Sequence, residues 1–351
     1  MTTGTVIVEM HEASAEHRTG RWHPESPDRL VAVTAGLERA HLDDALVRVA
    51  PGPACRVDLE RVHRPAYLDA IEAFCAAGGG EIDADTVVVQ ESWQAALLGA
   101  GAGLDAVGRL RRGEGDAAFI AVRPPGHHAT PTRAMGFCVI NNVAVAAAAL
   151  ADVGERVLIV DIDAHHGNGT QDAFYADDRV TYLSLHQWPF YPGTGGLAET
   201  GTGAGAGATV NLPLPAGTTG DVYLEAFDEV IVPVAERVNP TWVIISAGFD
   251  GHRADPLTDM GLSSGDYTDL VTRIAGLVPA GRRLVVLEGG YDLGALADCT
   301  TACLTSLAGE PRYPERVTNG GPGRSGVEAA RALHVSGDGP GAGDGRTAPD
   351  R

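Results

Sequence analysis

Short apolar runs alternate along this chain with longer amphipathic segments. Six runs rich in Val, Ile and Leu lie at residues 5–10, 117–122, 156–163, 179–186, 241–250 and 282–291. Four segments with Ala, Leu, Glu and Arg at helical spacing lie between them, at 92–113, 141–154, 221–239 and 266–278. Continuous apolar strands that alternate with helices are typical of an α/β fold. We therefore expect a single domain with a mostly parallel, multi-stranded sheet and helices on both faces.

Polar motifs directly follow four of the predicted strands. They read RPPGHH (123–128), DIDAHHGNG (161–169), DGHRADP (250–256) and EGGYD (288–292). Ligands of open α/β sheets bind beyond the carboxyl ends of the strands. The four segments are therefore expected to form one site at the C-terminal ends of the strands.

The last part of the chain differs in composition from the rest. Residues 315–351 are rich in Gly and Pro and contain few large apolar side chains. Such a segment cannot bury enough apolar surface to offset its conformational entropy. We expect one folded domain over residues 1–314, followed by a largely disordered tail in which a short helix at 326–333 is an alternative.

Charge and cysteine content limit which partners the protein can bind and in which compartment it can lie. The formal net charge is −20, and all 26 basic residues are Arg. This balance argues against a phosphate-tracking nucleic-acid groove and against docking on an anionic membrane. The five cysteines include no C-x-x-C pair, and neither a signal peptide nor an apolar run of membrane-spanning length is present. We expect a cytoplasmic protein that binds neither nucleic acid nor membrane. Both a monomer and a homo-oligomer are compatible with the sequence.

The segment Val160–Gly169 gathers ligands for a metal ion. If the strand continued to His165, then Asp161, Asp163 and His165 would share one face, because side chains alternate with a period of two. Carboxylate oxygen and imidazole nitrogen together suit a divalent transition metal, and Asp250 is the natural third ligand. Three protein ligands would leave one position for a water molecule. The alternative is a polar network in which these side chains neutralise one another without a metal.

Other metal-site patterns do not fit this chain. An EF-hand loop requires Gly at its sixth position, where the chain has His166. The zincin motif H-E-x-x-H fails at His11, because position 15 is Ala15. The H-x-E and P-C-x-x-C pair of the zinc deaminases is also missing.

Two adjacent histidines and a tyrosine supply proton-transfer groups. Pro124 to Gly126 form a stiff turn that fixes the approach of His127 and His128. Asp161 and Asn168 can each orient one of these imidazoles. Tyr291 follows two glycines and can donate a hydrogen bond to a developing oxyanion, although an ordinary amphipathic tyrosine would look the same. Metal-activated water, an acid–base histidine and an oxyanion donor together indicate hydrolysis of an amide.

Seven motifs, in order, resemble those of the zinc-dependent histone deacetylase and acetylpolyamine amidohydrolase family, especially its class II and bacterial members. They are HPESPDRL, RPPGHHA, GFCVINNVAVAA, DIDAHHGNGTQDAFY, LSLHQWPFYPGTG, SAGFDGHRADPL and EGGYDL, and the resemblance runs from about His11 to Ala308. It implies an arginase-like α/β fold and a catalytic domain over residues 1–314.

The same resemblance assigns roles to individual residues. It implies Zn²⁺ held by Asp163, His165 and Asp250; Fe²⁺ is the alternative metal for the same ligands. The catalytic set that it implies comprises His128 as general base and acid, His127 paired with Asp161, Asn168 beside His128, and Tyr291 on the acyl carbonyl. Its implied substrate-binding residues are Gly136, Phe137, Tyr191 and Leu257. A structural K⁺ is implied near Asp161, Asp163, His165, Ser184 and Leu185.

The resemblance leaves the substrate open. An acylated lysine, with acetyl as the favoured acyl group, or a related primary amine is expected. Acetylated polyamine is the rival, but the polyamine enzyme carries an acidic gatekeeper where this chain has Leu257. Glu81, Asp83 and Asp85 could still attract a cationic substrate, although a solvated acidic turn is the simpler interpretation. A non-catalytic acyl-amine-binding protein is the third alternative.

Overall fold

The computed structural model describes residues 3–336 as one α/β domain built on a parallel sheet. The eight strands run in the order β2-β1-β5-β10-β9-β6-β7-β8, and every neighbouring pair is parallel. Their bounds are β1 Val6–Glu9, β2 Leu46–Val49, β5 Ala117–Ile120, β6 Val157–Asp161, β7 Val180–Gln187, β8 Thr209–Leu214, β9 Trp242–Ala247 and β10 Arg283–Leu287. A separate antiparallel pair joins β3 Gly79–Glu81 to β4 Val87–Val89. The predicted fold class is confirmed.

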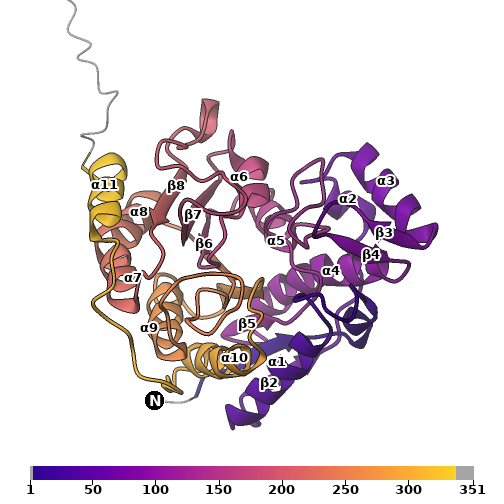
Figure 1. The fold of residues 1–351 in the computed structure, drawn as a ribbon, viewed down its shortest axis with the longest axis horizontal. Helices are drawn as coiled ribbons and strands as arrows, with labels where there is room; N and C mark the ends of the chain where they lie inside the picture. Colours follow the sequence, from indigo (N-terminus) through magenta and orange to yellow (C-terminus); the bar gives the residue numbers. More distant parts are fainter. Residues whose placement is uncertain (1–2, 337–351) are drawn as a thin grey trace, which may run out of the picture.

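Helices cover both faces of the sheet (Figure 1). One layer contains α2 Arg56–Leu59, α3 Pro65–Ala76, α4 Ser92–Arg111, α5 Asn142–Ala151 and α6 Asn168–Phe174. The other contains α1 Asp28–Arg39, α7 Gly220–Ala226, α8 Val232–Val238, α9 Ser264–Ala275, α10 Leu293–Leu307 and α11 Arg324–His334. A π-helical turn, Phe227–Ile231, joins α7 to α8, so the helix predicted at 221–239 is continuous but irregular.

Two hydrophobic cores result, one on each face of the sheet. Successive side chains of a strand point to opposite faces. In β6, Leu158 and Val160 accordingly join the core beneath α7–α10, while Ile159 joins the core beneath α3–α5. Both faces of the central strands are therefore apolar, which is why these strands read as uninterrupted apolar runs.

Residues 315–336 of the predicted tail are ordered, which corrects the expectation of disorder for this part, and the short helix considered at 326–333 is present within α11. Glu315 accepts hydrogen bonds from His252 at 2.6 Å and from the Ser264 amide at 3.0 Å. The helix α11 buries Val327 and Ala330, which are spaced three residues apart, against β8 and α7. Covering the edge strand β8 gives this short, mostly polar segment a partner that composition does not reveal. The rest of the predicted tail, 337–351, lies outside the described residues.

A buried carboxyl group on β1 makes unfolding pH-dependent. Glu9 is fully buried, neither carboxyl oxygen has a hydrogen-bond partner among the described residues, and the nearest cation is Arg109, 3.7 Å away. Burial, reinforced by the charge of Asp105, raises the pKa of Glu9 to about 8. Between the ordinary pKa of 4.5 and this value, the folded protein carries one more proton than the unfolded chain. The contribution of Glu9 to stability is therefore lost as the pH rises through this range.

Glu9→Gln removes this titration. We expect the free energy of unfolding of the variant, relative to wild type, to increase by on the order of 1 kcal/mol per pH unit between pH 5 and pH 8. Urea unfolding at pH 5, 6.5 and 8 measures the difference. Because a buried amide has its own fixed cost, the slope with pH is the informative quantity. Parallel curves for the two proteins would contradict the buried, protonated carboxyl group.

Candidate metal and catalytic site

Four loops meet beyond the carboxyl ends of adjacent strands. The strands β5, β10, β9 and β6 are consecutive in the sheet, and they are followed by the segments 123–128, 288–292, 248–257 and 162–168. A cavity of about 260 Å³ opens among these loops. Its lining residues are Asp85, His128, Gly136, Phe137, His165, Phe190, Tyr191, Leu257 and Tyr291.

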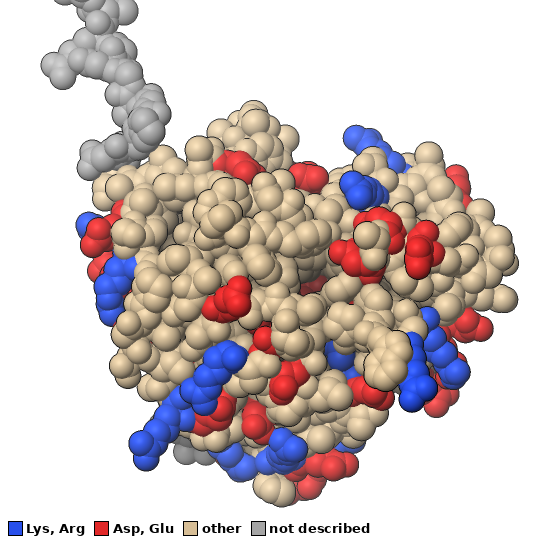
Figure 2. Space-filling model, viewed as in Figure 1, with Lys and Arg blue, Asp and Glu red and all other residues tan. Residues whose placement is uncertain are grey.

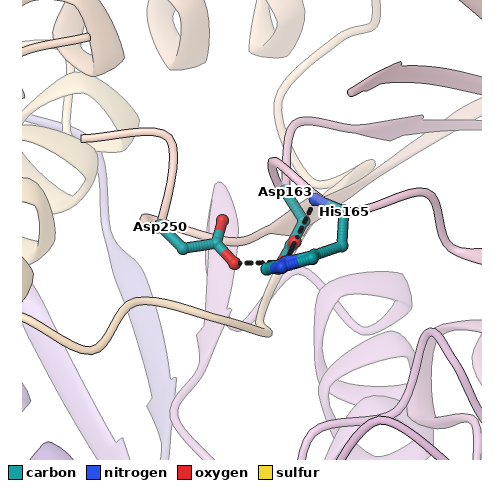
Figure 3. Close-up of side chains that lie close together, drawn as sticks. All are labelled: Asp163, His165 and Asp250. Carbon is teal, nitrogen blue, oxygen red and sulfur yellow. Dashed lines mark hydrogen bonds and ion pairs between the residues drawn. The ribbon is translucent and has the colours of Figure 1, made fainter. Parts of the chain in front are cut away.

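Asp163, His165 and Asp250 form a compact ligand cluster at this position (Figure 3). The Nδ1 atom of His165 lies 3.1 Å from Oδ1 of Asp163 and 2.9 Å from Oδ2 of Asp250. One ligand atom from each residue lies within 4.8 Å of the others, and the cluster is buried. In Figure 3, Asp250 approaches from the side opposite Asp163. Two carboxylates and one imidazole are the donor set of a divalent transition metal, so these residues fit such an ion.

Electrostatics also favour a cation in this cluster. Burial opposes protonation of His165, but Asp250 and Asp163 outweigh it and raise its pKa to about 10. Buried carboxylates are costly unless a positive charge compensates them. The cluster therefore requires a cation, either a proton on His165 or a metal ion.

The backbone around the cluster differs from the extended form considered above. Strand β6 ends at Asp161, and the following residues turn: the amide of Asp163 donates to Asp161 at 3.1 Å, and that of His165 donates to Asp163 at 2.8 Å. The turn, not strand alternation, brings Asp163 and His165 together. His166 contacts Thr194 and Gln171 instead, at 2.8 and 3.1 Å.

The two adjacent histidines have opposite environments. His127 Nδ1 donates to Asp161 at 3.1 Å, and its Nε2 lies 3.8 Å from Asp163. Burial opposes its protonation, but the charges of Asp163 and Asp161 raise the pKa of His127 to about 10. Burial and the neighbouring charge of His127 instead hold the pKa of His128 well below its usual value. Two titratable groups whose pKa values are driven apart are characteristic of acid–base chemistry.

Asn168 fixes the tautomer of His128. The Oδ1 atom of Asn168 accepts a hydrogen bond from His128 Nδ1 at 2.8 Å, while its amide nitrogen contacts Met135. The Nδ1 atom of His128 therefore carries the hydrogen, and its Nε2 lone pair is free. A neutral imidazole of this kind can accept a proton.

Tyr291 reaches the same cavity from β10. Its backbone amide donates to Asp255 at 2.7 Å, and its ring lies 5.7 Å from that of Phe137 and 5.1 Å from the Arg29 guanidinium. Gly289, which lies two residues before it, is required by space: a Cβ atom at this position would lie 2.3 Å from an Asp250 oxygen. The segment can therefore pass close to the ligand cluster only without a side chain at this position.

The residues that the sequence assigned to substrate binding share the cavity wall. Gly136, Phe137, Tyr191 and Leu257 all line it. The rings of Tyr191 and His128 have their centres 5.2 Å apart. Phe190 also lines the cavity, with its ring 5.4 Å from that of His165, but it had not been singled out. Its position directly after the Trp188–Pro189 pair of the LSLHQWPFYPGTG motif was the available signal.

The acidic residues at 81–85 and the residues of β7 expected near a K⁺ complete the set predicted from the sequence. Of the three acidic residues noted at 81–85, Asp85 lines the cavity. Ser184, on β7, pairs in register with Asp161, and both are fully buried. Leu185 is the next buried residue of β7.

The sequence profile of the histone deacetylase domain family matches residues 23–307. The chain belongs to the histone deacetylase family. A probable deacetylase of Archaeoglobus fulgidus is 40% identical over 316 residues, which cover 88% of this chain and 87% of that protein. A histone deacetylase-like amidohydrolase of Pseudomonas aeruginosa is 40% identical over 294 residues, covering 82% and 77%.

A solved structure agrees with this family assignment. The crystal structure of the HDA15 HD domain superposes with a TM-score of 0.88 at 36% identity, covering 95% of this chain and 96% of that one. Histone deacetylase family membership supports a deacetylase, and therefore an enzyme, that acts on acylated amines. Among the described helices, none combines the length and apolar character needed to cross a membrane.

Proposed function

We propose that the protein removes an acyl group, with acetyl favoured, from acylated lysine or a related primary amine by metal-assisted hydrolysis. The observation that carries this proposal is the meeting of a cation-requiring triad, a neutral histidine and a tyrosine in one cavity. Asp163, His165 and Asp250 would hold Zn²⁺ or Fe²⁺. Such an ion supplies Lewis acidity, which lowers the pKa of water and polarises a carbonyl oxygen.

The protein side chains would then handle the protons. His128, neutral and oriented by Asn168, takes a proton from the attacking water at Nε2 and returns it to the leaving amine. His127, paired with Asp161, stays positively charged beside it and stabilises developing negative charge. Burial raises the pKa of Tyr291 well above its usual value, so its hydroxyl stays protonated and can donate to the acyl oxygen.

The cavity wall supports acylated lysine as the substrate class. Aromatic rings of Phe137 and Tyr191 offer apolar surface for the methylene chain, and the Gly136 backbone is available to the substrate amide. Leu257 adds an apolar group where a carboxylate would favour a second ammonium group. We also propose a structural K⁺ at Asp161, Asp163, His165, Ser184 and Leu185, which the buried pairing of β6 with β7 supports.

Acetylated polyamine is the second candidate, and one observation favours it. Asp85 lines the cavity, and the chain carries a net charge of −20, so a polycationic substrate would be attracted to its mouth.

A turnover panel tests both candidates. We expect zinc-loaded protein to hydrolyse an acetyl-lysine peptide with a kcat/KM at least tenfold above that for acetylspermidine. Leu257→Glu should move this ratio toward the polyamine, because the new carboxylate pairs with the second ammonium group, whereas the size-matched Leu257→Gln should not. The reverse order in wild type would replace lysine by polyamine as substrate. Inactivity of the loaded protein on every acylated amine would contradict the proposed function.

A further inference from the structure

Glu288 is a buried carboxylate for which the proposed chemistry has no role. It immediately follows β10 and is fully buried. Its Oε2 atom accepts hydrogen bonds from the backbone amides of Gly126 at 2.7 Å and His127 at 3.1 Å. Its Oε1 atom accepts from the Ser246 hydroxyl at 3.1 Å. One side chain thus joins the ends of β5, β10 and β9, the three strands that lie side by side in the sheet.

These contacts fall on the backbone that carries the adjacent histidines. Other bonds hold their side chains: Asp161 holds the His127 ring and Asn168 holds the His128 ring. In the described part of the chain, the amides of Gly126 and His127 have Glu288 as their hydrogen-bond acceptor. The carboxylate therefore sets where the backbone of this turn lies, and the rings are then oriented from that position.

Glu288 also begins the segment that completes the other half of the site. The amide of Gly289 donates to Asp163 at 2.9 Å, and Tyr291 follows two residues later. The Glu288 side chain therefore fixes the distance between the histidine turn and the segment 288–291. This segment contacts Asp163 and contains Tyr291. A misplacement of about 1 Å between reacting groups can cost on the order of 100-fold in rate.

We propose that Glu288 is a positioning residue. It holds the Gly126–His127 backbone so that the His128 side chain is correctly placed relative to Tyr291 and the ligand cluster. This inference rests on the proposed function for its kinetic consequence. It attributes the loss of kcat to displacement of the carboxyl oxygens that accept these hydrogen bonds, and not to a change in the charge of Glu288.

Two conservative substitutions separate position from charge. Glu288→Gln removes the charge but keeps the length: its carbonyl oxygen can accept from both amides, while its NH₂ group donates to Ser246. Glu288→Asp keeps the charge but withdraws the carboxylate by one methylene group. Burial raises the pKa of Glu288 to about 7, so removing its charge costs less than it would for an exposed carboxylate.

The experiment measures kcat and KM on an acetyl-lysine peptide, together with zinc content and thermal unfolding. We expect Glu288→Asp to lose at least tenfold in kcat with KM within twofold of wild type and with full zinc content. Glu288→Gln should stay within threefold of wild type. A larger loss in the Gln variant than in the Asp variant would assign the effect to charge and overturn the proposal, and so would wild-type kcat in both.

Hydrogen exchange gives a second readout that needs no activity. The amides of Gly126 and His127 should exchange at least tenfold faster in Glu288→Asp than in wild type, and at nearly the wild-type rate in Glu288→Gln. Unchanged exchange in Glu288→Asp would overturn the positioning contact. If wild-type protein hydrolyses no acylated amine, the proposed function fails, whereas the exchange rates still decide whether Glu288 holds this turn.

Discussion

Replacing His128 with alanine is expected to lower kcat on an acetyl-lysine peptide by about 10³-fold, because general acid–base catalysis contributes 10²–10⁴ in rate. Tyr291→Phe should lower kcat by about 10²–10³-fold, which is the usual cost of one oxyanion donor. Neither side chain belongs to the ligand cluster. Zinc content and the thermal transition should therefore be preserved, and KM should change little.

Tyr223→Phe provides a matched control for the tyrosine. Tyr223 is fully buried, and its hydroxyl has no hydrogen-bond partner among the described residues, so its removal costs no hydrogen bond. The activity of this variant should equal that of wild type. Near-wild-type kcat in both His128→Ala and Tyr291→Phe would refute the assigned roles, whereas a comparable loss in Tyr223→Phe would indicate a general effect of tyrosine removal.

Removal of the metal is expected to abolish turnover and to destabilise the fold. Without an ion, the positive charge that lies between the buried carboxylates of Asp163 and Asp250 is that of a protonated His165. An ion present at about 1,000 times its dissociation constant adds about 4 kcal/mol to the free energy of unfolding. Chelator-treated protein should therefore be inactive and melt at a lower temperature. One equivalent of Zn²⁺ or Fe²⁺ should restore both properties.

The variant Asp250→Asn distinguishes ion binding at the ligand cluster from a non-specific effect of added ions. This variant should bind less than one equivalent of Zn²⁺ after dialysis, and added Zn²⁺ should restore neither activity nor melting temperature. Asp172→Asn, which changes an exposed carboxylate outside the cluster, should behave as wild type. Full activity of the chelated wild-type protein would remove the metal from the mechanism. A full equivalent of zinc in Asp250→Asn would remove Asp250 from the ligand set.

Central and edge strands differ in how well the sequence predicts them. The runs that became β1, β5, β6, β7, β9 and β10 are apolar on both faces because helices cover both. The edge strand β2 has no fully buried residue, and β8 contains Asn211 and Pro213, so neither gives this signal. Likewise, α11 has few apolar residues, and only its contact with β8 makes it part of the fold.

The features of the candidate site also differ in how well the sequence predicts them. Local motifs indicated which residues gather at the candidate site, because unpaired carboxylates and histidines at the end of an apolar strand require compensation. Spacing along the chain did not indicate the turn after Asp161 or the place of Phe190 on the cavity wall. Each of these depends on how segments far apart in sequence pack against one another.

By itself, the sequence determined the α/β class, the central strands and the identity of the Asp163–His165–Asp250 cluster, because burial pattern and residue chemistry are local properties. Only the tertiary structure decided that Glu288 holds the histidine turn, that the pKa values of His127 and His128 diverge, and that the chain remains folded to residue 336. These properties depend on distances across the parallel sheet, and strand order, which sets such distances, is not written in any single segment.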